Sequence, residues 1–501
     1  MLEKKWVIFL KNHFPENKKK WLMYFKFSLP IIITGFLFSL NGFIDNFMVT
    51  TIPHGVDSLS YANSWTGIVG GVITGISFVC SGIIGQYWGS KNYNKTKEVM
   101  RVRVLLTFIS VTIFSLFSLF FSKNMISVFY QIKQDEKTLQ QSIDYLRLIV
   151  ITWIIFAWTS PMSSLLTETG HGKEALISSI GSLLINIILN ILLIHVFNLG
   201  VKGAAFASIA ARIFGIFGDT FFVYKKVRKA LINPFSLLEV SKDTWKKIFI
   251  RIHSVILISS NTILIILRNI LFNKMYPQGT IGNVDWAIGA AAILGLTGAI
   301  SEMFLAVFGA ITSNISGFVG KYLGKKEFEI AKKNANELKG FHTIVAFILS
   351  FLLLFFSLLV PHINYFAAEI ATNSSTKEQA KILYLSELQK TLLVIVVFNP
   401  IWIWFSTSSR LIASGGRTNL VAILEFCLEF SALLWLIFIT FVIKPQDKNI
   451  SLSQTYWIFF LIDLVKFLVF EIVYLKVDWA KHIDDPLVKR KLFEKNVNNF
   501  N

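Results

Sequence analysis

The sequence is poor in charged residues and almost free of cysteine. Only 16% of its 501 residues are Asp, Glu, Lys or Arg, whereas soluble domains contain about 25%. Because 54% of the residues are hydrophobic and the mean hydropathy is +0.59, a soluble enzyme of two or three domains is excluded. The two cysteines, Cys80 and Cys427, both lie in apolar stretches. This argues against a disulfide framework or a cysteine metal site and predicts buried thiols.

Motifs of common catalytic and nucleotide-binding sites are also absent. The sequence contains no GxxxxGKS/T phosphate loop, no HExxH and no GxSxG, and its eight histidines are scattered. These absences argue against ATP-driven transport by this chain alone and against a membrane-embedded enzyme. We therefore expect no catalytic residues and no cofactor.

Long apolar segments dominate the chain. A helix needs about 20 apolar residues to cross a hydrocarbon core of ~30 Å. By this criterion the sequence predicts twelve transmembrane helices, because the runs are too long for the strands of an outer-membrane barrel. They lie near residues 27–50, 60–88, 103–121, 144–166, 174–197, 203–224, 252–273, 284–318, 341–360, 386–409, 419–441 and 453–475.

The net charge of +19 would suggest nucleic-acid binding in a soluble protein. Here 35 of the 49 Lys and Arg residues fall on the side that holds both termini, 10 on the opposite side and 4 within the spans. The positive-inside rule therefore predicts a multi-pass protein of the cell membrane with both termini in the cytoplasm. Its expected partners are the lipid bilayer and small molecules, not nucleic acid, and we expect a monomer.

Two sequence elements recur in the second half of the chain. GQYWGSKNYNKTKEV from Gly85 resembles GKYLGKKEFEIAKKN from Gly320 at a shift of 235 residues, and SSLLTETG from Ser163 resembles SSRLIASG from Ser408 at a shift of 245. Both copies of the first element fall on the same side of the membrane, so the repeats are parallel. The sequence thus predicts an all-α polytopic fold with two six-helix lobes related by a pseudo-twofold axis.

The polar connection 225–251 separates the first six spans from the last six. We place the N-terminal lobe at residues 1–235 and the C-terminal lobe, with its basic tail, at residues 236–501. The stretch from Pro234 to Phe249 is amphipathic and basic. It fits either a segment lying on the inner membrane surface or a plain solvated linker.

Asp45 is the one ionisable residue between Phe27 and Thr50, so it is a functional candidate in a membrane helix. Asn186 and Asn190 are four residues apart and share one helix face. The rise of about 1.5 Å per residue predicts similar depths for Asp45 and Asn190. A carboxylate beside amide oxygens could hold a proton or a Na⁺ ion. Alternatively, Asp45 borders its helix at the interface and the asparagines join helices together.

Ionisable residues in the spans of the second half allow two interpretations. Arg268, Glu302, Glu425 and Glu429 could form a second site in the C-terminal lobe, or they could belong to a structural ion-pair cluster with Lys466. The structural cluster is favoured. Asp463 and Lys466 are spaced to pair on their own helix. Candidates for lining a cavity for flat organic cations are Trp65, Trp158, Trp402 and Trp404.

Three stretches resemble the MATE family of multidrug and toxin extrusion proteins. NIILNILLIHVFNLGVKGAAFASIAAR, from Asn186 to Arg212, resembles the family's helix 5–6 pattern, and LPIIITGFLFSLNGFIDNFMV, from Leu29 to Val49, resembles its helix 1. GQYWGSKNY resembles the run that closes its helix 2. With the six-plus-six repeat, the resemblance covers nearly the whole chain. Flippases for polysaccharides and lipid precursors in the same superfamily share parts of these motifs.

The resemblance implies a secondary active transporter that exports cationic amphipathic compounds by antiport with H⁺ or Na⁺. It implies that Asp45, Asn186 and Asn190 form the coupling site, and they are the candidate ligands for Na⁺. The family's helix 5 aspartate is replaced here by Asn190, which removes one proton acceptor. Phe272 stands opposite Asp45 in the repeat, so the two lobes are expected to be functionally unequal.

A second interpretation keeps the fold and changes the cargo to a lipid-linked oligosaccharide or another lipid precursor. It predicts a cavity ringed by Arg and Lys side chains that hold phosphates. Arg212, Arg268 and Lys466, all within predicted spans, leave this interpretation open. A membrane enzyme or a channel would need clustered His and Asp ligands or a symmetric pore-lining repeat, and the sequence offers neither.

Overall fold

The computed structural model describes residues 13–49, 52, 55–128, 136–276, 290–363, 377–446 and 449–485. All regular secondary structure in these ranges is helical. The long helices of the first half are α2 (Lys18–Met48), α3 (Gly55–Gly89), α4 (Tyr93–Ser127), α5 (Glu136–Glu168), α6 (Gly172–Asn190) with its π-helical extension η2 (Ile191–Val196), and α7 (Val201–Lys226). A connection with the short helices η3 (Arg228–Ala230), η4 (Pro234–Ser236) and α8 (Lys242–Phe249) leads to the second half.

The second half contains α9 (Ile252–Met275), α10 (Ala290–Phe304), α11 (Val307–Ile315), η6 (Ser316–Gly320), α12 (Lys321–Gly324), α13 (Phe328–Leu359), α14 (Lys377–Ile412), η9 (Ala413–Arg417), α15 (Thr418–Phe438), η10 (Ile439–Ile443), α17 (Leu452–Phe460) and α18 (Ile462–Lys476). Among the described residues, nine helices are long and apolar enough to cross a membrane, and one of these, 381–446, runs through two predicted spans. A pair bent by 42°, α10 and α11–α12, supplies another span, and α17 with α18 covers the last.

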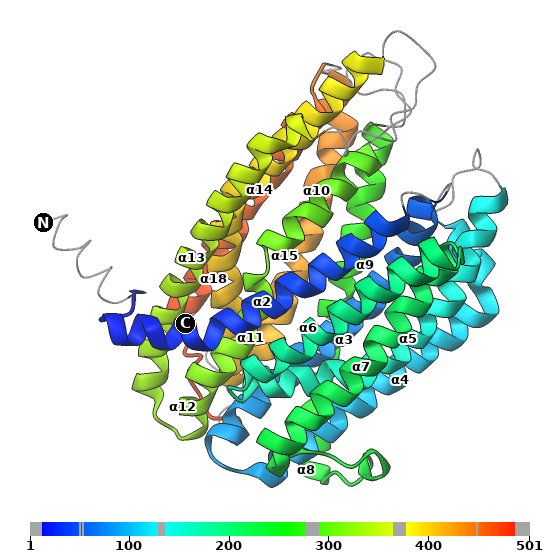
Figure 1. Cartoon of the computed structure of the whole chain (residues 1–501). Helices are drawn as coiled ribbons and strands as arrows, with labels where there is room; N and C mark the ends of the chain where they lie inside the picture. Colours follow the sequence, from blue (N-terminus) through cyan, green and yellow to red (C-terminus); the bar gives the residue numbers. More distant parts are fainter. Residues whose placement is uncertain are drawn as a thin grey trace, which may run out of the picture.

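The helices form two groups that meet along α2 and α3. Helices α4 to α7 pack with α2 and α3 in the first group, and α9, α10 and α13 to α18 make up most of the second (Figure 1). Between the groups, α3 packs on α9, η6 and α12, and α2 packs on α10 and α11. The predicted fold class, twelve helices in two lobes, is confirmed. The boundary expected at residues 235/236 falls in η4, within the connection between α7 and α9.

The backbone confirms the 235-residue repeat. Lys91 and Lys326, which the repeat aligns, both have positive φ, +60° and +62°, a conformation that is uncommon outside glycine. The hydrogen bonds around them also match: the N–H groups of Lys91 and Asn92 donate to Trp88 and Tyr87, and those of Lys326 and Glu327 donate to Leu323 and Tyr322. Each copy therefore ends its helix with the same tight turn.

The two copies of the element pack against each other around the pseudo-twofold axis. Gly85 and Gly320, which the repeat aligns, lie in direct backbone contact, because a Cβ on Gly320 would sit 3.3 Å from Gly85. A Cβ on Gly89 would sit 2.4 Å from Lys321, and one on Gly324 would sit 1.9 Å from the carbonyl oxygen of Gln86. These are equivalent contacts, since Gln86 aligns with Lys321. Glycine is required here because the backbones of two helices approach within van der Waals contact.

The second repeat match is displaced by one residue in the structure. Gly170 and Gly416 both have positive φ, +93° and +90°, whereas the sequence match aligns Gly170 with Gly415. The C-terminal copy contains the π-helical turn η9, and a π-helical turn accommodates one residue more than an α-helical turn. The sequence match predicts a shift of 245 residues, but the two glycines with positive φ, Gly170 and Gly416, are 246 residues apart.

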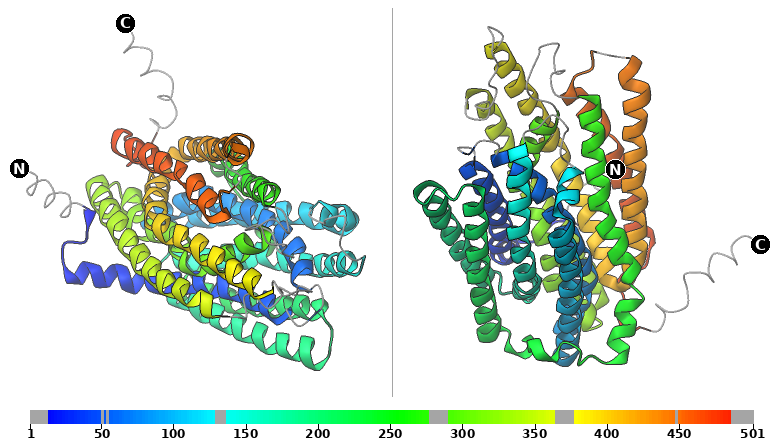
Figure 2. Two further views of the ribbon diagram at one scale, coloured as in Figure 1. Left: turned by 90° about the horizontal axis from the view of Figure 1, so that it is seen from above. Right: turned by 90° about the vertical axis from the view of Figure 1, so that its right-hand side faces the viewer.

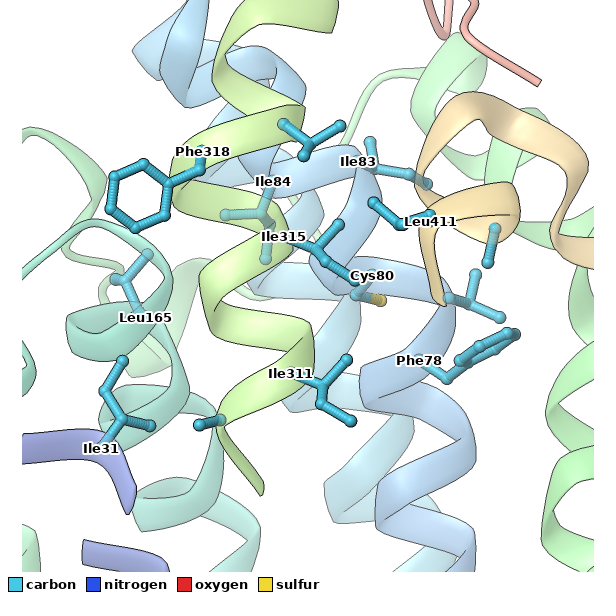
Figure 3. Packing of buried hydrophobic residues seen from close by; sticks show 14 of the residues in the cluster. Ile31, Phe78, Cys80, Ile83, Ile84, Leu165, Ile311, Ile315, Phe318 and Leu411 are labelled. Atoms are coloured by element: carbon cyan, nitrogen blue, oxygen red, sulfur yellow. The ribbon is translucent and has the colours of Figure 1, made fainter. Parts of the chain in front are cut away.

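A shared apolar core joins the two groups of helices. Cys80 and Ile84 of α3, Ile311 and Ile315 of α11, and Leu411 of α14 belong to one buried cluster (Figure 3). Cys80 is fully buried as expected, but Cys427 on α15 is exposed, so the expectation of two buried thiols is wrong for Cys427. A thiol behaves as a small hydrophobic group, so it suits an exposed position of an apolar membrane helix as well as a protein core.

The segment that follows α18 crosses the end of α3 and contacts α8. Gln86 Oε1 accepts a hydrogen bond of 2.7 Å from the N–H of Ile483, and the hydroxyl of Tyr87 donates to Asp484 Oδ1 at 3.0 Å. Lys247 Nζ of α8 lies 2.5 Å from the same oxygen. Burial acts to raise the pKa of Asp484, but the bonds from Lys247 and Tyr87 outweigh it and lower the pKa. Three distant parts of the chain are thereby joined at this end, which we call the basic end, where α2 begins and α18 ends.

The glycine contacts at the basic end can be tested by adding one methyl group. Gly324→Ala is expected to lower the free energy of unfolding by about 1–3 kcal/mol, the usual cost of overpacking, because the new Cβ would overlap the carbonyl of Gln86. Chemical denaturation in mixed micelles measures the change. The matched control is Gly309→Ala in α11, where a Cβ meets open space and removal of a helical glycine should stabilise by roughly 0.5–1 kcal/mol. Equal effects of both substitutions would contradict the packing described above.

Candidate functional site

Asp45 lies three residues before the end of α2, remote from the basic end, and only 7% of it is exposed. The side chain of Asn190, the last residue of α6, donates a hydrogen bond of 2.7 Å to Asp45 Oδ1. The similar depths predicted from the helix rise are therefore confirmed. These two helices pack closely along their length, which places the carboxylate and the amide against each other.

The carboxylate belongs to a small network of neutral groups. Ser208 Oγ on α7 donates to Asp45 Oδ2 at 3.1 Å, and Asn190 Nδ2 also donates to Asn186 Oδ1 at 3.0 Å. Asn186 Nδ2 lies 3.4 Å from Ser208 Oγ, which closes the ring. Both asparagines are completely buried. The structure thus brings together all three residues predicted for the coupling site and adds one that sequence reasoning missed.

Two features distinguish this network from an ordinary buried hydrogen-bond cluster. No ion pair joins Asp45 to a cationic side chain in the described part of the chain, so the groups that donate to its carboxylate are all neutral. In addition, the buried Oδ1 of Asn190 has no hydrogen-bond partner among the described residues. A buried acceptor without a partner costs about 1–3 kcal/mol. A bound cation would use both this oxygen and the carboxylate.

The backbone next to Asn190 is not α-helical. The π-helical segment η2 begins at Ile191 and runs to Val196, and such segments are frequent at functional sites because they redirect side chains. The guanidinium of Arg212 on α7 lies 5.1 Å from the Phe38 ring and 4.5 Å from the Phe156 ring, and these two rings stack on each other. Among the described residues, no hydrogen bond or ion pair occupies the guanidinium of Arg212.

The donor set is made of oxygen atoms. The described residues contain no group of three or more His, Cys, Asp or Glu side chains that could hold a metal ion. One carboxylate with amide and hydroxyl oxygens suits a hard monovalent cation such as Na⁺, or a proton on the carboxylate itself, by the preference of hard cations for oxygen ligands.

The four candidates of the C-terminal lobe occupy different surroundings. Arg268 and Glu429 line one small cavity with Phe459, whose ring lies 5.6 Å from the Arg268 guanidinium. Glu425 on α15 accepts a hydrogen bond from Ser409 on α14. Glu302 lies on α10, where its carbonyl oxygen is 3.4 Å from Ser39 Oγ of α2. No described contact links all four residues into one site.

Lys466 is the centre of the structural cluster favoured from the sequence. Its ammonium lies 2.8 Å from Glu429 and 2.8 Å from Asp463, so the expected pairing with the aspartate is confirmed. Trp402 Nε1 donates to Asp463 at 2.6 Å. All four tryptophans proposed to line a cation cavity donate their indole N–H within the protein, to Met125, Thr220, Asp463 and Glu471.

A second buried charge pair lies between α4 and α5. Arg103 Nη1 is 3.0 and 3.2 Å from the two oxygens of Glu168, and Ser81 Oγ of α3 donates to Glu168 at 2.5 Å. Both charged side chains are at most 2% exposed. The neighbouring Thr167 hydroxyl accepts a hydrogen bond from Ser313 of α11 at 2.9 Å. Sequence reasoning missed this pair because both residues lie at the ends of apolar segments, where charged side chains are common and suggest no buried contact.

Comparisons with known proteins agree with this architecture. Residues 30–192 match the MatE family model. The chain is 24% identical over 210 residues to an uncharacterized membrane protein of Methanocaldococcus jannaschii. The match covers 41% of this chain and 47% of the relative, so the chain spans about half the length of that protein. The resemblance to the MATE family noted in the sequence is thus confirmed for the segment that contains α2 and α6.

Solved structures show the same fold over most of the chain. A MATE transporter of Vibrio cholerae, VcmN, in a mutant form, is 13% identical with a TM-score of 0.74 and covers 91% of this chain and 96% of its own. An outward-facing multidrug resistance MATE transporter is 16% identical with a TM-score of 0.73, covering 90% and 94%. A MOP superfamily transporter from Pyrococcus furiosus, described as having a binding pocket of reverse polarity that suggests a different function, is 16% identical with a TM-score of 0.72, covering 91% and 96%.

Proposed function

We propose that this chain is a secondary active transporter that exports cationic amphipathic compounds by antiport with H⁺ or Na⁺. The observation that carries the proposal is Asp45, a carboxylate buried in a membrane helix and surrounded by neutral donors. A buried charge without an ion-pair partner in this environment is costly. Binding of a proton or Na⁺ removes the cost, which gives the site a reason to bind a cation reversibly.

Coupling requires that the two transport states bind the cation with different affinity. The ring of Asp45, Asn190 and Ser208 joins α2, α6 and α7, so a change in the charge of Asp45 changes the packing of three helices. Protonation would weaken the hydrogen bonds that the carboxylate accepts, and Na⁺ would turn the oxygen of Asn190 toward it. In either case the arrangement of the N-terminal lobe responds to the ion.

The packing of the lobes supports an arrangement closed toward the basic end. Glycine contacts between α3 and α12, the apolar core around Cys80 and the segment after α18 all lie at this end. With both termini in the cytoplasm, as the positive-inside rule predicts, the closed side is cytoplasmic and Asp45 lies toward the outer side. This agrees with export, in which the coupling ion enters from outside while the cargo leaves.

A second candidate is transport of a lipid-linked precursor. Arg410 supports it, because its guanidinium lies 4.2 Å from the Phe78 ring and lines a small cavity between the lobes with Ser316 and Ser414. Arg212 and Arg268 also stack on aromatic rings and have no carboxylate within ion-pair distance among the described residues. Unpaired guanidinium groups fit phosphate oxygens. This candidate predicts an anionic cargo, in contrast to the first.

Dye transport in proteoliposomes separates these possibilities. Purified protein should drive accumulation of a fluorescent organic cation when a H⁺ or a Na⁺ gradient is imposed at clamped membrane potential, and the gradient that works identifies the coupling ion. Movement of a fluorescent phospholipid-linked sugar without movement of the cation would replace the first proposal by the second. Absence of any gradient-dependent flux for both cargoes would contradict coupled transport.

A further inference from the structure

The connection between the two lobes carries the most exposed large apolar side chain of the described chain. Phe235 is 97% exposed and Leu238 is 78% exposed. In the helices around them such exposure is expected where side chains meet lipid. Phe235, however, lies in η4 and Leu238 in the turn that follows it, past the end of α7. An apolar pair presented in this way marks a contact surface.

The turn that presents them is held firmly. Arg101 of α4 donates to the carbonyl oxygen of Glu239 at 2.6 Å and to Ser236 Oγ at 3.0 Å, and it pairs with the Glu239 carboxylate at 3.0 Å. Asn233 Oδ1 accepts the N–H of Phe235 at 3.0 Å. On the protein side, Ile232 is buried in the core. The apolar pair thus points outward because the opposite face of the turn is anchored.

The lipid-facing side of α7 leads directly to this turn. Phe217, Phe221 and Tyr224 are 69%, 55% and 51% exposed, and their spacing of four and three residues places them on one face. Arg228 lies with its guanidinium 5.0 Å from the Tyr224 ring. An aromatic ring next to a long cationic side chain is typical of the membrane–water interface. The interface is therefore reached at the end of α7, a few residues before Phe235.

The connection is also strongly basic. Residues 225–251 contain eight Lys and Arg but two acids, and both acids are paired, Glu239 with Arg101 and Asp243 with Lys247. Lys225, Lys229 and Lys242 are exposed. The right-hand view of Figure 2 shows this connection crossing the basic end of the bundle from one group of helices to the other. Basic side chains around an apolar tip are the pattern of a segment that binds anionic lipid.

We propose that Phe235 and Leu238 insert into the bilayer leaflet at the basic end, with the surrounding Lys and Arg side chains binding the phosphates of anionic phospholipids. The occupant of this surface is the membrane itself. The sequence left the choice between a surface-lying segment and a solvated linker open, and the rigid, outward presentation of the pair favours the first. The membrane thereby holds the joint between the lobes while the lobes move.

Spin labels at single positions test the proposal. Phe235→Cys and Leu238→Cys, each in a Cys427→Ser background, are labelled with a nitroxide, and the protein is reconstituted in vesicles of phosphatidylcholine with phosphatidylglycerol. Both labels should collide more often with oxygen than with a water-soluble nickel complex. Glu327→Cys and Glu329→Cys, at exposed positions of the same end outside the connection, are the controls and should show the reverse ratio. Labels at 235 and 238 with the same ratio as the controls would overturn the insertion.

The electrostatic part has its own test. Arg228→Gln with Lys229→Gln should reduce the immersion of the 235 label in vesicles with phosphatidylglycerol and leave it unchanged in pure phosphatidylcholine. Equal immersion in both lipids for the unsubstituted chain would overturn the role of the basic residues. Elution of every variant as a single symmetric species checks that folding is retained. The experiment does not depend on transport, so its result stands apart from the function proposed above.

Discussion

Asp45→Asn is expected to reduce gradient-driven transport to the level of protein-free vesicles. Asparagine has the same shape: its amide oxygen can still accept from Asn190, and its NH2 group can donate to the Ser208 hydroxyl, so the contacts that hold α2 against α6 and α7 remain. What disappears is the negative charge, and with it the group proposed to bind H⁺ or Na⁺. Without a difference in ion affinity between the two states, a gradient cannot bias the conformational equilibrium.

The measurement is accumulation of the fluorescent cation under the gradient that drives the unsubstituted protein. The control is Asp144→Asn on α5. The Asp144 carboxylate lies 3.1 Å from Lys202 Nζ, and the Lys202 side chain is 54% exposed. Because exposed ion pairs contribute about 0–1 kcal/mol to stability, this variant should retain transport. Asn190→Ala should weaken apparent ion affinity while leaving some transport, because one oxygen of the site is lost and the charge is kept. Full gradient-driven activity of Asp45→Asn would exclude the proposed role.

Features of the fold that depend on length and periodicity were predictable from the sequence. The twelve spans follow from apolar runs of membrane length, and the turn at Lys91 and Lys326 follows from the repeated Gly-x-Lys pattern. The pairing of Asp45 with Asn190 was predictable because both helices start on the same side, and a fixed rise per residue converts sequence position to depth.

Other features depend on rotation and packing, which one sequence does not specify. Ser208 joins the site, but hydroxyls are common in membrane helices and most of them bond to their own backbone, as Thr34 does with Pro30. Gly170 corresponds in conformation to Gly416, one residue after the Gly415 that the sequence match aligns with it. The π-helical turn η9 causes this change of register, and nothing in the sequence marks it. Whether Arg268 and Glu302 belong to one site likewise depends on how α9 and α10 are rotated about their axes.

Arg103→Met is expected to be the most destabilising single substitution considered for this chain. It leaves the Glu168 carboxylate buried among α3, α4 and α5 with only Ser81 as a donor. Removing one partner of a buried ion pair typically costs about 3–5 kcal/mol, since the remaining charge is uncompensated. Chemical denaturation in mixed micelles should therefore show a loss of this size, far above the change from Lys202→Met in the exposed pair with Asp144.

The double variant decides whether the charge or the packing is responsible. If uncompensated charge causes the loss, adding Glu168→Gln to Arg103→Met should recover most of the stability, because a neutral amide still accepts from Ser81 and no buried charge remains. If the guanidinium acts mainly by filling space, the double variant should be as unstable as Arg103→Met alone or less stable. Recovery would also mean that the ion pair contributes little net stability. Its role would then be to align α3, α4 and α5. These helices meet next to the Thr167–Ser313 hydrogen bond, which links the two lobes.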